Sequence, residues 1–320
     1  MTIWLALLAC AASKPSVPAR TEAPELRSVL ASDGPLESRL AAPDNASLVI
    51  FYAGEQKGSL DPCGCPDRPR GGLARMHAYI DATKTGQAVP VVIVDGGNFF
   101  EDAMGLDGEA RPEVPVMNRY VVEGLGRIGF DALNAGTPDL SGLTGLGDGS
   151  VNLPIVSANA HGPGVWPSRV VEAGGLRVAI TGITSRGVSF LPTPAYVVED
   201  PVEAGRATLR PLRQRSDLVV LLSYQAADAA RTLAREGLAD VVVDTNLHST
   251  FDESLRVGRA IWVRSSLTTM QLGELRLTLA DGRIVQALDR KIDLDAEIVG
   301  NAEDELLADQ ARREVAAATH

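Results

Sequence analysis

Two cysteines separated by one glycine carry the most distinctive chemistry of this chain. Cys63 and Cys65 lie between Gly54 and Gly71, in a segment that also contains three prolines. A disulfide at this spacing closes a very small ring, which is strained and easily reduced, so it would make a poor structural staple. Three interpretations are open: a structural disulfide or incidental thiols, a redox pair, or two thiolate ligands of a metal ion.

The residues around the pair bear on the last two interpretations. Arg68, Arg70 and Arg75 follow closely, and positive charge favours the thiolate that thiol–disulfide exchange requires. A metal site would need an imidazole besides the two sulfurs, such as that of His77 or His248, and would then suit zinc or Cu(I). Two cysteines at this spacing do not specify a metal by themselves.

The third cysteine, Cys10, ends a short apolar run at the N-terminus. The sequence Leu7-Leu8-Ala9-Cys10 resembles a bacterial lipobox, and residues 11–24 are rich in Ala, Pro and Ser, as a tether would be. Lipidation of Cys10 would attach two acyl chains, enough for stable membrane anchoring. We therefore expect residues 1–10 to be a lipoprotein-type signal. The protein would then be anchored in the bacterial cell envelope, facing the periplasm or the exterior.

Composition narrows the remaining function classes. The formal net charge is -11 and no dense basic run occurs, so nucleic acid is not expected as a partner. Apolar residues make up 45% of the chain, as in a soluble domain with a real core, and no stretch approaches the roughly 20 apolar residues that span a bilayer.

Strands and helices alternate along the chain after a linker. Residues 11–45 contain five prolines and are expected to be linker, with a short helix near residues 25–30. Strands are expected at residues 46–52, 89–94, 131–134, 153–158, 170–172, 176–183, 218–223, 240–243, 260–264, 271–279 and 283–292. Helices are expected at residues 72–83, 113–128, 200–213, 226–236 and 303–318. This alternation predicts an α/β fold with ligand-facing loops at strand ends and an antiparallel closing hairpin.

Eight stretches, in this order, resemble the N-terminal domain of the periplasmic 5'-nucleotidases, within the calcineurin-like metallophosphoesterase superfamily. They are Ser59-Leu60-Asp61-Pro62, Gly71-Gly72-Leu73-Ala74-Arg75, Val94-Asp95-Gly96-Gly97-Asn98, Gly129-Phe130-Asp131-Ala132-Leu133, Ser157-Ala158-Asn159, Asp200-Pro201-Val202-Glu203-Ala204, Asp217-Leu218-Val219-Val220-Leu221-Leu222-Ser223 and Asp240-Val241-Val242-Val243. The resemblance covers roughly residues 46 to 280. It implies a four-layer α/β/β/α sandwich with mixed sheets at residues 46–295, followed by a C-terminal helix and tail at 296–320.

The resemblance also implies a two-metal site with ligands in five loops, and it assigns this chain's residues to them. In the first loop, an Asp-x-His pair is replaced by Glu55 and Lys57. In the second, Asn98 stands where a bridging Asp is usual, and an amide cannot offset the charge of two cations. Asp95, at the end of the preceding strand, is expected to orient this second loop.

The other three loops depart from the family in the same way. The third loop usually reads Gly-Asn-His-Glu, and here it is Gly136-Thr137-Pro138-Asp139. In the fourth, Tyr224 takes the place of a His and is expected to pack there. In the fifth, Asn246 and His248 remain of Gly-His-x-His. The resemblance therefore implies that most metal ligands are replaced, with Glu55, Asp95, Asn98, Asp139, Asn246 and His248 as the candidates if one divalent ion binds.

These observations predict a binding or thiol-dependent protein centred on Cys63 and Cys65, with a small phosphate ligand or a redox partner. A Cys-Gly-Cys before Gly-Gly-Leu-Ala-Arg also resembles a lipoprotein subgroup of the same family. The fold would place this loop near the former metal site. The alternative is an active metal-dependent phosphoesterase with a rebuilt ligand set, formed by Glu55, Asp95, Asp139, Asp244 and His248.

Overall fold

The computed structural model describes residues 24–31, 34–41, 44–64, 67–102, 109, 111–147, 151–186, 195–246, 254–265 and 270–319. Cys10, Cys65 and His248 lie outside these ranges, so the predictions made for them are not tested by the fold. None of the helices in these ranges combines the length and the apolar character that a membrane span requires.

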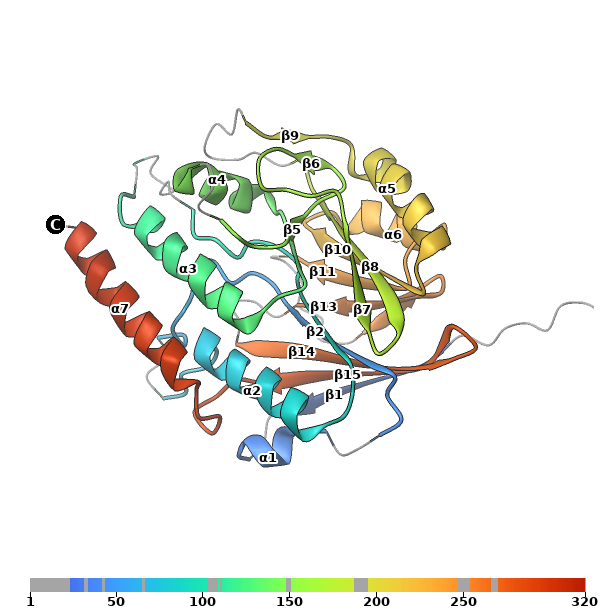
Figure 1. The fold of residues 1–320 in the computed structure, drawn as a ribbon, viewed down its shortest axis with the longest axis horizontal. Helices are drawn as coiled ribbons and strands as arrows, with labels where there is room; N and C mark the ends of the chain where they lie inside the picture. Colours follow the sequence, from blue (N-terminus) through green and yellow to red (C-terminus); the bar gives the residue numbers. More distant parts are fainter. Residues whose placement is uncertain are drawn as a thin grey trace, which may run out of the picture.

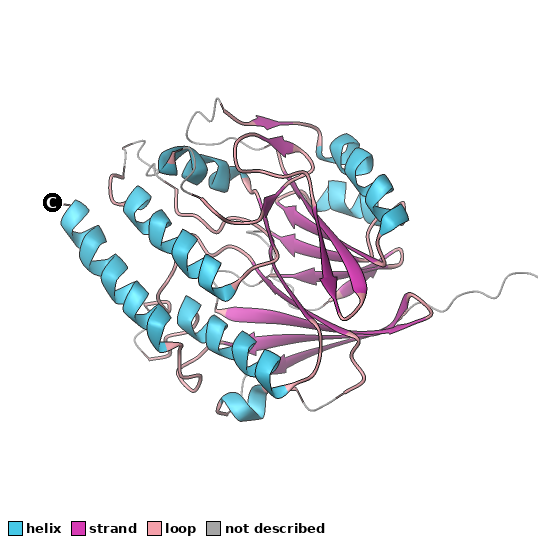
Figure 2. Cartoon of the chain, viewed as in Figure 1, coloured by secondary structure: helices cyan, strands magenta, loops and turns pink. Residues whose placement is uncertain are grey.

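Two mixed sheets form the centre of the molecule (Figure 2). The first contains, from edge to edge, β1 (Glu25–Ala31), β15 (Arg283–Asp293), β14 (Gln271–Ala280), β2 (Leu48–Ala53), β3 (Val91–Asp95), β4 (Ala132–Asn134) and β5 (Ile155–Val156). The second contains β12 (Leu255–Val257), β13 (Ala260–Arg264), β11 (Val241–Thr245), β10 (Leu218–Tyr224), β8 (Leu176–Thr184) and β7 (Arg169–Ala173). A small ribbon pairs β6 (Ala160–His161) with β9 (Val197–Val198).

Helices cover the outer face of each sheet (Figure 1). The first sheet carries α2 (Leu73–Gly86), α3 (Val114–Ile128), α4 (Thr137–Leu146) and α7 (Ala302–Ala318), and the second carries α5 (Pro201–Arg215) and α6 (Ala227–Arg235). The apolar residues accordingly form three clusters: one between the sheets and one under each helical layer. This is the four-layer α/β/β/α sandwich that the sequence predicted.

Strand β2 shows why these segments are continuous apolar runs in the sequence. Its even-numbered residues, such as Ile50, face the second sheet, while its odd-numbered ones, such as Phe51, face the helices, and all six are buried. Alternate side chains point to opposite faces of a strand, so a strand covered on both sides needs apolar residues throughout. The predicted cap of α5 is also confirmed, because Oδ1 of Asp200 accepts hydrogen bonds from the N–H groups of Val202 and Glu203 at 3.0 Å.

The segment predicted to be a linker carries two elements of the fold. The helix expected near residues 25–30 is wrong: β1 occupies Glu25–Ala31 and pairs in parallel with β15 at the edge of the sheet. A helical turn, α1 (Leu36–Arg39), follows it. The strand forms because its backbone groups are satisfied by β15, a partner more than 250 residues away that local periodicity does not reveal.

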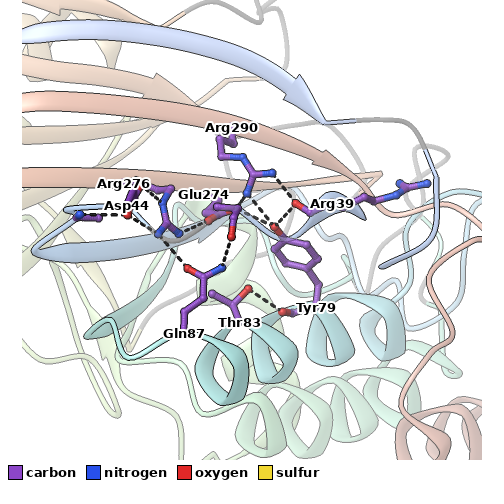
Figure 3. A network of polar contacts seen from close by, with 10 residues as sticks. Arg39, Asp44, Tyr79, Thr83, Gln87, Glu274, Arg276 and Arg290 are labelled. Carbon is purple, nitrogen blue, oxygen red and sulfur yellow. Dashed lines mark hydrogen bonds and ion pairs between the residues drawn. The ribbon is translucent and has the colours of Figure 1, made fainter. Parts of the chain in front are cut away.

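A buried network of charged and polar groups fastens α1 to the first sheet (Figure 3). Its centre is Glu274, which is fully buried and accepts hydrogen bonds from Arg276, Arg290 and the hydroxyl of Tyr79 at 2.6, 2.5 and 2.8 Å. Arg290 and Tyr79 also donate to the main-chain carbonyl of Arg39. Two guanidinium groups around one carboxylate are tolerated in the interior because each is hydrogen-bonded and further acidic groups balance the charge, as Asp44 does for Arg276.

Candidate functional site at the carboxyl ends of the strands

Strands β2, β3 and β4 are neighbours and run in parallel, so their carboxyl ends open at the same edge of the first sheet. The loops that follow them begin at Gly54, Gly96 and Ala135. Ligands of α/β proteins bind at such an edge. The structure brings Glu55, Asp95, Asn98 and Asp139 close to one another here.

Glu55 lies at the centre of this group. Its side chain is 1% exposed, and its Oε2 accepts a hydrogen bond from Nδ2 of Asn98 at 2.8 Å and lies 3.3 Å from Nζ of Lys57. Burial raises the pKa of the Glu55 carboxyl, and the contacts with Asn98 and Lys57 oppose that rise. Its other oxygen, Oε1, is buried without a hydrogen-bond partner among the described residues.

Asp95 is held by the loop that follows β2. Its Oδ2 accepts a hydrogen bond from Nε2 of Gln56 at 2.7 Å, and its Oδ1 accepts one from the N–H of Gly97 at 2.8 Å. Burial raises the pKa of Asp95 to about 7, these two hydrogen bonds lower it, and the charge of Glu55 raises it further. Sequence reasoning missed Gln56, whose position between Glu55 and Lys57 in the first loop was the available signal.

Asp139 organises the backbone of the second loop. Its Oδ2 accepts from the N–H groups of Asn98 and Gly136 at 2.7 and 2.9 Å, and its Oδ1 from those of Phe99 and Phe100 at 2.9 and 3.0 Å. Burial raises the pKa of Asp139 well above its ordinary value, against these four donors. With both oxygens occupied twice, this carboxylate has no lone pair left for a metal ion.

Residues of the second sheet pack directly against the loop that follows β3. A Cβ on Gly96 would lie 1.9 Å from Oγ1 of Thr245, and one on Gly97 would lie 3.2 Å from Cβ of Tyr224. These glycines are therefore required where the two sheets meet. Tyr224 is 3% exposed, and a Cβ on Gly136 would lie 3.0 Å from its Cδ1, in agreement with its predicted packing role.

Asp244 and Thr245 end β11 on opposite faces. Thr245 points between the sheets, toward Gly96, whereas Asp244 points to the helical side, where Nε of Arg264 lies 3.7 Å from its Oδ2. Burial raises the pKa of Asp244 to about 6, and Arg264 lowers it. Asn246 follows Thr245 directly, at the carboxyl end of β11 in the second sheet. Asp244 is thus separated by the sheet from the other candidate ligands.

Solved structures share this architecture. A sulfate thiohydrolase, SoxB, from Thermus thermophilus superposes with a TM-score of 0.69 at 16% identity, over 86% of this chain and 62% of that one. A 5'-nucleotidase precursor from the same species superposes with a TM-score of 0.64 at 19% identity, over 84% of this chain and 59% of that one. The NAD nucleotidase NadN of Haemophilus influenzae superposes with a TM-score of 0.69 at 14% identity, over 84% of this chain and 60% of that one. The chain has the 5'-nucleotidase-like metallophosphoesterase fold.

At these identities the likeness establishes the fold alone. This chain spans about 60% of the length of each of those structures. No family model matches its sequence, and no curated protein does either. Because the fold hosts more than one chemistry, the function must come from the site itself.

The described residues do not fit the dinuclear metal centre usual for this metallophosphoesterase fold. Lys57 and Asn98, which the resemblance assigns to two ligand positions, both direct their donors to Glu55. Asp139 is saturated by backbone N–H groups. Among the residues that the structure describes, no three His, Cys, Asp or Glu side chains gather as a metal site would require.

The cysteine loop leaves the same edge and turns toward α2, α7 and the end of β15. The N–H of Cys63 donates to the carbonyl of Arg70 at 2.7 Å, and the N–H of Arg70 donates to Sγ of Cys63 at 3.3 Å. His77, a candidate third ligand, has Nδ1 2.5 Å from Asp304 and Nε2 3.3 Å from Asp81. Because carboxylates of α2 and α7 contact both ring nitrogens, His77 has no nitrogen left to bind a metal ion together with the cysteine sulfurs.

Proposed function

We propose that this chain does not hydrolyse phosphate esters by a two-metal mechanism, and that it acts as a binding or thiol-dependent protein through the Cys63-Gly64-Cys65 loop. The observation that carries the proposal is the contact of Lys57 and Asn98 with Oε2 of Glu55, 3.3 and 2.8 Å away. An ammonium group at a ligand position repels the cations that the ordinary mechanism needs.

The geometry favours this proposal over an active phosphoesterase with a rebuilt ligand set. That set would require Glu55, Asp95, Asp139, Asp244 and His248 to converge. Asp139 is saturated by four N–H donors, and Asp244 lies on the other face of β11. Glu55 and Asp95 alone supply fewer anionic ligands than two hard divalent ions take. A small phosphate group remains a candidate ligand for Lys57, whose side chain is 40% exposed.

We further propose that the protein is held in the cell envelope by lipid at Cys10 and faces the periplasm or the exterior. This proposal is supported by the lipobox-like sequence alone. Cell fractionation of the full chain should find it with membranes, and the Cys10→Ser variant should appear in the soluble fraction. A Cys10→Ser variant that stays with the membranes would contradict lipid anchoring at this residue.

Metal analysis and a phosphatase assay test the main proposal. The purified full chain is assayed with a generic phosphate ester in added manganese, beside His248→Ala and His161→Ala, the latter altering a half-exposed histidine of β6. We expect less than one equivalent of bound metal and no turnover. About two equivalents of metal, with turnover abolished by His248→Ala and retained in His161→Ala, would overturn the proposal in favour of the rebuilt hydrolase.

A further inference from the structure

Main-chain hydrogen bonds hold the loop after β2 against the loop after β3. The N–H of Glu55 donates to the carbonyl of Gly97 at 3.0 Å, and the N–H of Lys57 donates to the carbonyl of Asn98 at 2.9 Å. Glu55 and Lys57 have φ values of 57° and 51°, in the left-handed region that non-glycine residues seldom adopt. The main chain of Lys57 is therefore fixed beside Glu55 and Asn98, independently of the contacts that its side chain makes.

The ammonium group of Lys57 lies against the carboxylate of Glu55. Its Nζ is 3.3 Å from Oε2 of Glu55, the same oxygen that accepts the hydrogen bond from Asn98 at 2.8 Å. A buried carboxylate needs hydrogen bonds or a nearby positive charge to remain ionised. In the part of the chain that the structure describes, Lys57 is the one cation that forms an ion pair with Glu55.

Two further buried acids lie beside this ion pair. Oδ1 of Asp95 accepts a hydrogen bond from the N–H of Gly97, whose carbonyl accepts one from Glu55. Oδ2 of Asp139 accepts one from the N–H of Asn98 at 2.7 Å. Among the described residues, no Lys or Arg forms an ion pair with Asp95 or Asp139, and no positive charge acts noticeably on either. Three buried carboxyl groups therefore share one ammonium group.

Two of these carboxyl groups keep lone pairs that a cation could use. Oε1 of Glu55 is buried and accepts no hydrogen bond from the described residues. Each oxygen of Asp95 accepts one hydrogen bond, so each retains an acceptor site. Carboxylate oxygens and water are the ligands that manganese and magnesium prefer. What opposes a cation at Glu55 is therefore the charge of Lys57.

We propose that the ammonium group of Lys57 is the resident cation of this site and keeps the protein free of metal. It supplies to Glu55 the positive charge that a metal ion supplies in the dinuclear centre usual for this fold. Because the ammonium is tethered to the same loop, it competes for Glu55 at a high effective concentration, and it repels a second cation. This rests on the proposed absence of two-metal chemistry, and it adds that removal of one residue uncovers a site for a single divalent ion.

Lys57→Ala tests the proposal with manganese as the probe. Binding is followed by titration calorimetry, and the melting temperature is measured in manganese and in chelator. The parent should melt alike in both. Lys57→Ala should bind about one equivalent of manganese, and its melting temperature should rise by about 3 °C or more at saturation. Lys57→Arg keeps the positive charge and should bind none.

Two further variants locate the effect. Lys84→Ala is the matched control, since Lys84 is an exposed lysine of α2, and it should behave like the parent. Adding Glu55→Gln to Lys57→Ala should weaken the gained manganese binding by at least about tenfold, a loss that is usual even for groups surrounding a metal ligand. If Lys57→Ala does not fold, Lys57→Gln, which keeps a polar side chain without the charge, takes its place.

The proposal is overturned if Lys57→Ala gains no more manganese affinity than Lys84→Ala, or if Lys57→Ala and Lys57→Arg bind manganese equally. Its failure differs from that of the proposed function. Two bound metal ions and phosphate-ester turnover in the parent would refute the proposed function. A parent with neither property, beside a Lys57→Ala variant that also binds no manganese, would leave the proposed function intact and refute the role of Lys57.

Discussion

Asn98 donates a hydrogen bond from its side-chain amide to Oε2 of Glu55 over 2.8 Å. Both residues have positive φ values, 63° and 57°, in the left-handed region that non-glycine residues seldom adopt. The loops after β2 and β3 are therefore held in uncommon backbone conformations by side chains that bond each other. The polar groups at this edge of the sheet largely satisfy one another.

Replacing the amide of Asn98 by a carboxylate should destabilise the protein, because it would place a second acid beside Glu55. In Asn98→Asp the new acid would face Glu55 in a buried setting, where like charges repel. We expect the free energy of unfolding at pH 7 to fall by about 2 kcal/mol, and added manganese to restore part of it. Urea unfolding measures this, with the exposed Asn45→Asp as control. A variant as stable as the parent, with no response to manganese, would contradict the expectation.

Asp139 should be essential to stability rather than to catalysis. In Asp139→Asn one side-chain oxygen is kept and the other is replaced by an amide NH₂ group. The two backbone N–H groups that donate to the replaced oxygen in the parent would then face this NH₂ group and lose their acceptor. A loss of about 3 kcal/mol in the free energy of unfolding follows from two unsatisfied buried donors. Asp228→Asn, which alters a 99% exposed carboxylate of α6, should change it by less than about 0.5 kcal/mol. Equal losses in the two variants would show that the four contacts contribute little.

The buried acids should make the protein more stable in mildly acidic solution. Burial raises the pKa of Asp95 to about 7, while in the unfolded chain it titrates near 4, at about the usual value. Between these values the folded state binds more protons than the unfolded state, so stability falls as pH rises from about 4 to 7.

Asp95→Asn isolates the contribution of this one carboxyl. In the variant, the fall in the free energy of unfolding between those pH values should be smaller than in the parent by on the order of 3 kcal/mol. Part of the slope should remain, since burial also raises the pKa of Glu55, Asp139 and Asp244. Chemical unfolding at several pH values provides the measurement. A parent that gains stability from pH 4 to 7, or an unchanged slope in the variant, would refute this assignment.

Glu274 should be the residue on which the network in Figure 3 depends. Glu274→Gln leaves Arg276 and Arg290 in the interior without their shared carboxylate. Removing one partner from a buried ion pair costs about 3 to 5 kcal/mol, so a large drop in the melting temperature is expected. Glu172→Gln, on the exposed side of β7, should melt close to the parent. If both variants melt alike, the network does not stabilise the fold.

Much of the fold follows from local pattern. Apolar runs such as β2 and β10 and the cap of α5 depend on neighbours in sequence, which is why they were predicted at nearly the right residues. Strand β1 was predicted as a helix, because its partner β15 lies at the other end of the chain. Helix α4 was not predicted, since Thr137-Pro138-Asp139 was assigned by resemblance to a metal-ligand loop, although Pro138 also suits a helix start.

For the candidate site, too, some properties follow from the residue types and others depend on the tertiary structure. Residue types alone predicted that Lys57, Asn98 and Pro138 would not serve the usual metal chemistry, because an ammonium, an amide and a pyrrolidine ring have fixed donor properties in any fold. Only the tertiary structure decided that Asp139 bonds four backbone N–H groups and that Asp244 faces away from Glu55. The chemistry of a side chain is local, whereas its partners depend on how distant strands pair and which face each residue presents.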